Sequence, residues 1–164
     1  MITELAVGVV LFVLAVLYVS WTAGRLDRLH ARVDAAWAAL DAALVRRAAA
    51  ARAVAAALPA GPQAAALERA ARATLGSGGP EGREALENDL SRALRTAMPV
   101  LPPAVDLTEL EQAATRVGLA RAFHNAAVRD TRVVRLRRIP RALRLAGHRE
   151  LPQYFEIDDT TVPH

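Results

Sequence analysis

The pattern of apolar and polar positions begins with an uncharged run near the N-terminus. Residues 5–23 read LAVGVVLFVLAVLYVSWTA, close to the ~20 apolar residues that a helix needs to cross a ~30 Å hydrocarbon core. A cleaved secretory signal would need basic residues ahead of a shorter run, whereas Glu4 is the only charge there and bulky Trp21 stands near the end. The pattern therefore predicts a retained membrane anchor over residues 1–24.

Basic residues follow this run and none precedes it. Arg25, Arg28 and Arg32 come soon after it, and such a bias places the basic side in the cytoplasm. Tyr18 and Trp21 stand near the same boundary, where aromatic rings favour the headgroup layer. We expect a single-pass protein of the cell membrane, with its N-terminus outside and the rest of the chain cytoplasmic.

Beyond Gly24 the apolar residues recur at helical spacing, and no segment alternates like a strand. The first segment, 25–58, carries a seven-residue series interrupted at Arg47, and a second row three or four residues on. These two rows are Leu26, Val33, Leu40 and Val54, then Leu29, Trp37, Leu44 and Leu58. Near-heptad spacing of this kind predicts a long helix with a coiled-coil-like contact face.

Clusters of Pro and Gly at 58–62, 76–80 and 99–103 divide the remainder into three further helices. Pro62 and Pro80 fit first-turn positions of the two short inner helices. Their expected buried stripes are Leu67, Ala70, Ala71 and Leu75, then Leu86, Leu90, Leu94 and Met98. The last helix, 106–138, opens with Asp106 and Glu109 in capping-box spacing. Its stripe is Leu110, Val117, His124 and Thr131, beside Ala113, Ala120, Ala127 and Val134.

The fold class expected is all-α: a transmembrane helix followed by an antiparallel four-helix bundle over residues 25–147, with a tail over 148–164. Short connections force sequential helices to lie antiparallel. The long first and last helices, each about 50 Å at ~1.5 Å per residue, would bring the end of the fourth back to the membrane. Because the inner helices are shorter, part of the outer pair would be covered by each other, by the tail or by another molecule.

Three stretches carry a family resemblance: RVDAAWAALDAAL (32–44) with Arg46 and Arg47, RAFHNAAVRD (121–130) and PQYFE (152–156). The chain resembles the LemA family, which has a membrane helix with its N-terminus outside and a cytosolic bundle of long antiparallel helices. The residues that fit its motifs are Val33, Asp34 and Trp37, then Asn125, Ala127 and Val128, with Tyr154 and Phe155 in the tail. His124 stands where members usually have Tyr, and residues 59–105 match only in helical character and length. The resemblance implies no catalytic activity, and some members occur beside membrane-bound peptidases.

Composition excludes several chemistries. All 21 basic residues are Arg and there is no Cys, so Schiff bases, P-loop lysines, disulfides and thiolate sites are absent. Among the histidines only His30, in Asp27-x-x-His30, has a carboxylate at metal-ligand spacing, and the inward Glu and His set of a dimetal bundle is missing. Ser20, Ser77 and Ser91 stand in no nucleophile elbow. His124 is expected in the core or an interface, and the chain is predicted to be no enzyme, with no cofactor or metal.

Two sets of charges stand out, each with a bland alternative. Asp27, Asp34 and Asp41 recur every seven residues. Antiparallel pairing of the long helices would bring them near Arg135, Arg129 and Arg121, respectively. These residues would then form ion pairs that set the register of the helices, or they would simply form a solvated charged face. The lipid-facing candidates are Arg132, Arg135, Arg137, Arg138, Arg141 and Arg144, interleaved with aliphatic residues. They predict contact with the anionic inner leaflet. Alternatives are a solvated basic face, or a nucleic-acid patch, disfavoured because stacking aromatics are missing.

The tail ELPQYFEIDD is expected to cap the bundle with Tyr154 and Phe155, the alternative being a short partner-binding strip. Together these patterns predict a membrane-anchored, non-catalytic interaction or scaffold module at the cytoplasmic face. The alternative function is a regulatory subunit of a membrane peptidase or transporter, which an exposed apolar strip would favour, and an enzyme with an unrecognised site comes third. The expected partners are anionic lipid and a membrane protein or a second copy of the chain, with no nucleic acid.

Overall fold

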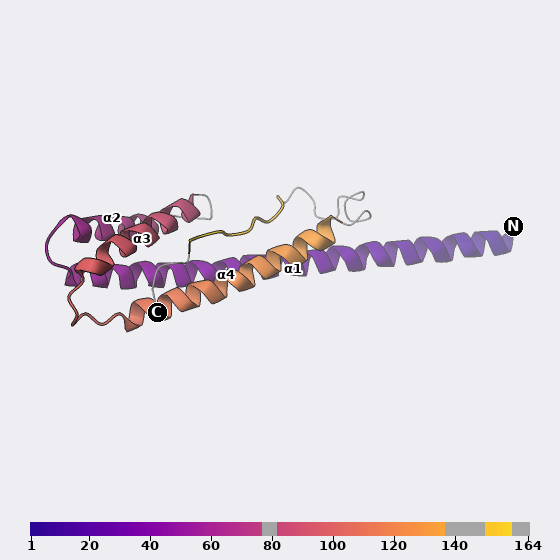
Figure 1. The fold of residues 1–164 in the computed structure, drawn as a ribbon. Coiled ribbons are helices and arrows are strands. Elements are labelled where there is room, and N and C mark those ends of the chain that lie inside the picture. The colour runs from indigo at the N-terminus through magenta and orange to yellow at the C-terminus, as the bar shows by residue number, and fades with distance from the viewer. Residues whose placement is uncertain (77–81, 137–149, 159–164) are drawn as a thin grey trace. The chain divides into compact units, whose positions relative to one another are not determined.

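The described part of the chain is helical throughout its regular structure. A computed structural model describes residues 1–76, 82–136 and 150–158 (Figure 1). It contains α1 (Ile2–Ala57), α2 (Pro62–Gly76), α3 (Arg83–Ala97), the 3-10 helix η1 (Met98–Val100) and α4 (Thr108–Arg135). No residue in these three ranges belongs to a strand. The all-α class predicted from the sequence is therefore confirmed.

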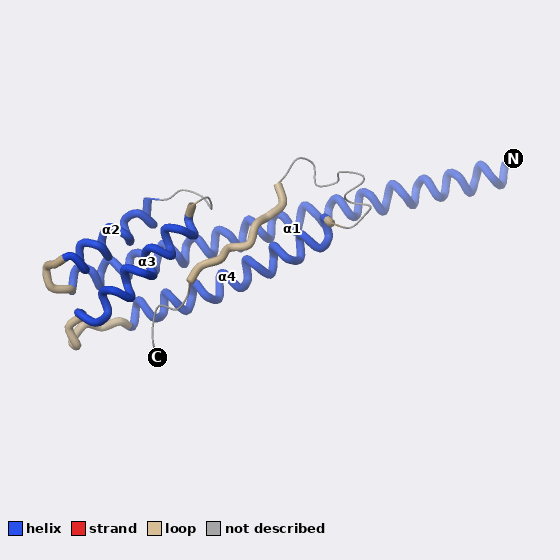
Figure 2. The backbone as a smooth tube through the Cα atoms, turned by 45° about the horizontal axis from the view of Figure 1, so that its top comes forward, coloured by secondary structure: helices blue, strands red, loops and turns tan. Residues whose placement is uncertain are grey.

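α1 is one helix of 56 residues, where the sequence suggested an anchor and a separate first bundle helix. Figures 1 and 2 both show it unbroken from the apolar run into the Ala-rich segment. Gly24 lies inside it, since a lone glycine costs a helix only about 1 kcal/mol and Ala, Leu and Arg on either side favour the helix. The helix ends at Ala57 because Pro59 and Gly61 follow closely.

The chain divides into two compact units, and each of them combines two separate stretches of the sequence. The first unit comprises Met1–Ala35 and Ala126–Tyr154, and the second unit comprises Ala36–Asn125 and Phe155–His164. The two long helices each contribute residues to both units, which is why breakers in the sequence do not mark this division.

In the first unit, α1 starts with an apolar stretch that is exposed at almost every position. It includes a window of mean hydropathy 2.5 that is long enough to cross a membrane, and none of that window is buried in the protein. Burial begins at Thr22 and Leu26 and continues through His30 and Val33. There the Thr131 hydroxyl of α4 donates hydrogen bonds to the carbonyl oxygens of Ala127 and Leu29. One helix thus supplies both a bare apolar segment and a packed one.

The second unit has two apolar clusters. The larger, called the alanine core here, joins the end of α1 to α2, α3 and the start of α4. Its members are Ala48, Ala51, Val54, Ala55, Leu58, Leu67, Ala71, Leu90, Leu94, Ala97 and Leu110. Small alanine side chains let the helices approach closely, while the leucines fill the space between them. The smaller, called the tail cluster, consists of Leu40, Ala43, Leu44, Val117, Phe155 and Ile157, with Trp37 and Ala120 packed against it.

Most predicted stripes are buried, with two corrections. α2 begins at Pro62 as expected, but the buried side of α3 is centred on Arg83, Glu87, Leu90, Ser91, Leu94 and Ala97, with Leu86 and Met98 only partly covered. The predicted stripe was right at Leu90 and Leu94, but it did not include Arg83 and Glu87, which are buried as an ion pair. α4 begins at Thr108, and the Asp106 carboxylate accepts a hydrogen bond from Thr108 N–H at 2.9 Å, in place of the capping-box bond to Glu109. Pro80 lies outside the described residues.

Candidate functional site

The most elaborate arrangement of polar side chains surrounds the C-terminal segment Phe155–Asp158. This segment is extended and appears as the end of the tan tube in Figure 2, and its burial alternates, with Phe155 and Ile157 inward and Glu156 and Asp158 outward. Such alternation is that of a strand, although no strand pairs with it here. Side chains from α3 and α4 supply its hydrogen bonds, so we call the surface that holds it the tail groove.

A stripe of polar residues on α3 forms one wall of the tail groove. The stripe is Glu84, Asn88, Ser91 and Arg95, spaced four, three and four residues apart and hence on one helix face. Glu156 N–H donates to Glu84 Oε1 at 2.7 Å, Asp158 N–H donates to Asn88 Oδ1 at 2.8 Å, and Ser91 Oγ donates to the Asp158 carbonyl at 3.1 Å. Arg95 forms an ion pair with the Asp158 carboxylate at 2.9 Å.

Asn125 of α4 forms the opposite wall. Its Nδ2 donates to the Phe155 carbonyl at 3.1 Å, and its Oδ1 accepts from Phe155 N–H at 2.9 Å. A single side-chain amide thereby satisfies both main-chain groups of one residue, as a neighbouring strand would. Arg121, one turn earlier, donates to the Ile157 carbonyl.

An aromatic cluster forms the floor beneath Phe155, which is 2% exposed. The Trp37 ring packs edge-on against Phe155 at 5.6 Å and against His124 at 5.5 Å between ring centroids. Edge-to-face pairs are worth about 0.5–1.5 kcal/mol beyond the area that they bury. His124 is buried in the core, as expected.

The residues that carry the family resemblance are therefore mostly packing residues. Trp37, Asn125 and Phe155 meet in the tail groove of the second unit, whereas Val33, Ala127 and Val128 are buried in the first unit. Asp34 is exposed. Tyr154 is 42% exposed and lies under the Arg132 guanidinium, 5.4 Å from the ring centroid, so only Phe155 of the two tail aromatics is a buried plug.

Next to the tail groove, charged residues are buried inside the second unit. The Glu87 carboxylate is 0% exposed and lies 3.1 Å from Arg83 Nε and 3.6 Å from Arg47 NH1, and Arg83 also contacts Asp41 at 3.2 Å. Burial raises the pKa of the Glu87 carboxyl, while both guanidiniums act in the opposite direction. Arg47 also donates to Ser91 Oγ, which ties this ionic cluster to Asp158.

This cluster accounts for two features of the sequence. The interruption of the heptad series at Arg47 marks a buried cation with a buried anion opposite it. Asp41 also finds its ion-pair partner here, in Arg83, rather than in the expected Arg121, since Arg83 is the guanidinium that α3 brings to this side of α1. The buried position of Arg83 and Glu87 had one signal in the sequence, because the spacing Arg83-x-x-x-Glu87 places both on the helix face of Leu90 and Leu94.

The other expected ion pairs have different outcomes. Asp27, Asp34 and Arg129 lie at exposed positions. Arg135 NH1 donates to the Glu150 carbonyl and Arg132 NH1 to the Pro152 carbonyl, both within the first unit. An interhelical pair that was not expected joins Arg32 to Asp130 at 3.6 Å. Arg137, Arg138, Arg141 and Arg144 lie outside the described residues.

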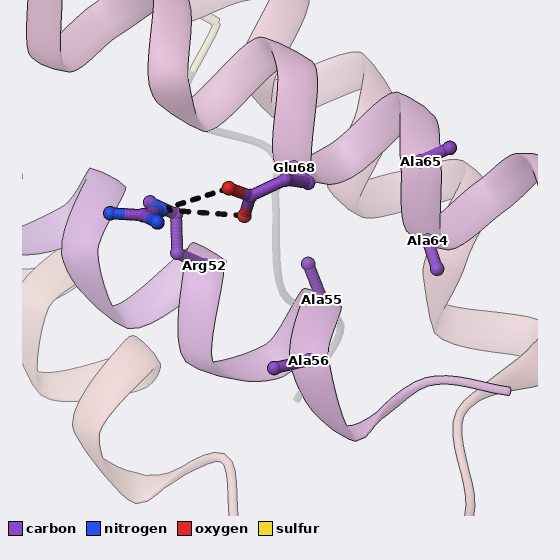
Figure 3. A pocket seen from close by; sticks show the side chains of 6 residues that line it. All are labelled: Arg52, Ala55, Ala56, Ala64, Ala65 and Glu68. Carbon is purple, nitrogen blue, oxygen red and sulfur yellow. Dashed lines mark hydrogen bonds and ion pairs between the residues drawn. The ribbon is translucent and has the colours of Figure 1, made fainter. Parts of the chain in front are cut away.

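The described ranges hold no group of three or more His, Asp or Glu that could bind a metal ion. An open hollow of about 410 Å³ between α1 and α2 is lined by Arg52, Glu68 and four alanines (Figure 3). Its polar groups already satisfy each other, because Glu68 lies 3.2 Å from Arg52 and 2.7 Å from Arg72. The Arg72 hydrogen bond is the largest cause of the lowered pKa of Glu68.

The other candidate residues have structural partners. His30 Nδ1 lies 2.8 Å from the Leu26 carbonyl in its own helix. Ser91 is a hydrogen-bond relay between Arg47 and Asp158. Ser77 lies outside the described residues.

Comparison with protein-family models, with curated proteins and with solved structures found no match. The resemblance to the LemA family therefore rests on the motif residues themselves.

Proposed function

We propose that this chain is a single-pass, membrane-anchored helical module whose cytoplasmic part binds other molecules without catalysing a reaction. The observation that carries the proposal is the continuity of α1, in which a bare apolar segment passes directly into a packed one. An unbroken helix transmits position from the membrane to the packed residues without a flexible joint.

An antiparallel bundle of the LemA kind is part of the proposal. It is supported by the contacts within each unit. As the residue number on α1 increases, the number of its contacting residue on α4 decreases. In the first unit Leu29 contacts Thr131 and Arg32 contacts Asp130. In the second unit Trp37 packs on His124, and Leu40 and Leu44 share a cluster with Val117. Opposite numbering of this sort is what antiparallel helices produce.

Contact with anionic lipid is also part of the proposed role. Arg132 and Arg135 each donate one N–H group to a carbonyl of the tail and keep their positive charge. Val133 and Leu136 beside them are exposed and available to the interface. The proposed lipid contact also includes Arg137, Arg138, Arg141 and Arg144, which lie outside the described residues.

The orientation can be tested because the chain has no cysteine of its own. Single substitutions Thr3→Cys and Glu111→Cys place one thiol at each side of the proposed span. In intact spheroplasts a membrane-impermeant maleimide should label T3C, and it should label E111C only after permeabilisation. The reverse pattern would overturn the orientation, and loss of both variants from carbonate-washed membranes would overturn the anchor.

The binding role is tested by purifying the full chain from its native membranes in mild detergent, with residues 1–31 alone as the control. A near-stoichiometric protein that stays with the full chain and not with the control is the expected result. If the chain came away alone from its native membrane, the role as a protein scaffold would be wrong.

A regulatory subunit of a membrane protein is the second candidate, favoured by one exposed apolar pair on α4. Leu119 and Phe123 are 57% and 69% exposed and lie four residues apart, on one helix face. Phe123→Glu should then release a bound membrane protein, whereas Glu111→Gln on the same helix should not.

A further inference from the structure

The tail groove recognises its occupant mainly through the main chain. Every residue from Phe155 to Asp158 has a backbone N–H or carbonyl bonded by a side chain of α3 or α4. None of these bonds depends on which side chain the segment carries at that residue. Backbone bonding of an extended segment, with pockets for alternate side chains, is how peptide-binding sites hold their ligands.

The pockets and the charges add selectivity. Phe155 and Ile157 fill the tail cluster, the Glu156 side chain is exposed, and the Asp158 carboxylate meets Arg95. The groove therefore selects an extended peptide with an aromatic residue first, any residue second, an aliphatic residue third and an acidic residue fourth. The guanidinium of Arg121 next to Ile157 adds a second positive charge on the opposite wall.

We propose that the tail groove is a peptide-recognition site, and that Phe155–Asp158 is its resident occupant, displaced when a partner protein presents an extended segment of the same aromatic, any, aliphatic, acidic pattern. This inference rests on the proposed role as a binding module and names the class of partner.

Two observations favour displacement of Phe155–Asp158 by a similar peptide over its simple release. The bonds from Glu84, Asn88 and Arg95 are at exposed positions, where water competes for them. The floor, by contrast, is apolar, and below it Ser91 links the Asp158 carbonyl to buried Arg47. An empty groove would open this interior to water, so the resident segment leaves only when a similar segment takes its place.

The first test uses the full chain in detergent micelles with the double substitution F155A/I157A. A fluorescent peptide QYFEIDD, the sequence of residues 153–159, should bind this variant at least ten-fold more tightly than it binds the wild type, whose groove is filled. A control peptide with Ala at both apolar positions should not bind. Equal affinity for both proteins, or for both peptides, would overturn the proposal.

A second test keeps Phe155 and Ile157 in place, in case the double variant does not fold. The substitution Glu84→Cys puts a thiol beside the groove, and Glu111→Cys gives a matched exposed thiol on α4 away from it. A peptide QYFCIDD whose Cys is activated as a 2-pyridyl disulfide should exchange with the E84C thiol, releasing 2-thiopyridone, at least ten times faster than with E111C. Excess QYFEIDD should slow this exchange. Equal rates, or no adduct with E84C, would contradict the proposal.

A second copy of the chain is a distinguishable outcome. If E84C on one copy and Glu156→Cys on another, activated as the same 2-pyridyl disulfide, form a mixed dimer as fast as the peptide adduct, the occupant is the tail of another copy, and a distinct partner is excluded. If the peptide fails while the chain still holds a membrane partner, this inference falls and the proposed function stands. If the peptide binds but the chain is absent from membranes, this inference stands and the proposed membrane-anchored function falls.

Discussion

Asn125 is the residue through which α4 holds the C-terminal segment, and its loss should be measurable. Asn125→Ala removes both bonds to Phe155, which at about 0.5–1.5 kcal/mol per hydrogen bond should lower the free energy of unfolding by about 1–3 kcal/mol. Asn125→Asp keeps an acceptor for Phe155 N–H but sets a carboxylate oxygen against the Phe155 carbonyl, so it should cost at least as much as Asn125→Ala. Urea denaturation in micelles, followed by Trp37 fluorescence in a Trp21→Phe background, provides the measurement.

The control for that series is Gln112→Ala, at an exposed position of the same helix. It should change the free energy of unfolding by less than about 0.5 kcal/mol, as is usual for a surface substitution. If N125A were as stable as Q112A, the bonds to Phe155 would contribute nothing and the tail would be held by its apolar side chains alone.

Glu87 makes the stability of the second unit depend on pH. Because burial raises its pKa above the ordinary 4.5, the folded protein binds this proton more tightly than the unfolded chain does. The free energy of unfolding contributed by this group is therefore fully present at low pH and falls as the pH rises from about 4.5 through the raised value. Glu87→Gln should remove this decline, because its neutral amide has no proton to release.

Urea titrations of wild type and E87Q at several pH values test this sign. Glu111→Gln is the matched control, since Glu111 lies exposed on α4, and it should leave the pH profile of the wild type unchanged. A wild-type profile in which stability rises with pH, with the rise lost in E87Q, would show that the Arg partners outweigh burial.

At the scale of elements, the sequence predicted the helices well and their faces less well. Helix-breaking residues and apolar spacing located α2, α3 and α4, whereas α1 was expected as two helices, and most of the stripe residues expected on α1 and α4 are buried. The face of α3 was misjudged because whether Arg83 and Glu87 are buried depends on Arg47 and Asp41 of another helix, which spacing within α3 cannot reveal. The same holds for the tail groove, although the polar stripe Glu84, Asn88, Ser91 and Arg95 was a readable signal.

The start of α3 gives a prediction about backbone conformation. Gly82 precedes the helix with φ of 73°, a left-handed conformation that side chains disfavour, although no atom lies within 4 Å of where a Cβ would be. Gly82→Ala should therefore destabilise by about 1 kcal/mol through backbone strain alone. Gly118 lies inside α4 with equally open space and no left-handed φ, so Gly118→Ala should stabilise by about 0.5–1 kcal/mol. Thermal unfolding of both variants should give opposite signs, and the same sign for both would refute this reasoning.

At the scale of the whole molecule, anchoring and folding of the second unit should be separable by substitution. Leu11→Arg and Leu14→Arg together place two charges within the exposed apolar part of α1. At roughly 2.5–3.5 kcal/mol per Arg near the centre of a span, the pair should oppose insertion by about 5–7 kcal/mol. The double variant should therefore be absent from carbonate-washed membranes.

The second unit contains none of these residues, so Trp37 fluorescence in the Trp21→Phe background should still report a packed tail cluster. Leu11→Ala with Leu14→Ala is the control that should stay in the membrane. Retention of the Arg variant would mean that residues 5–23 are not what holds the chain there.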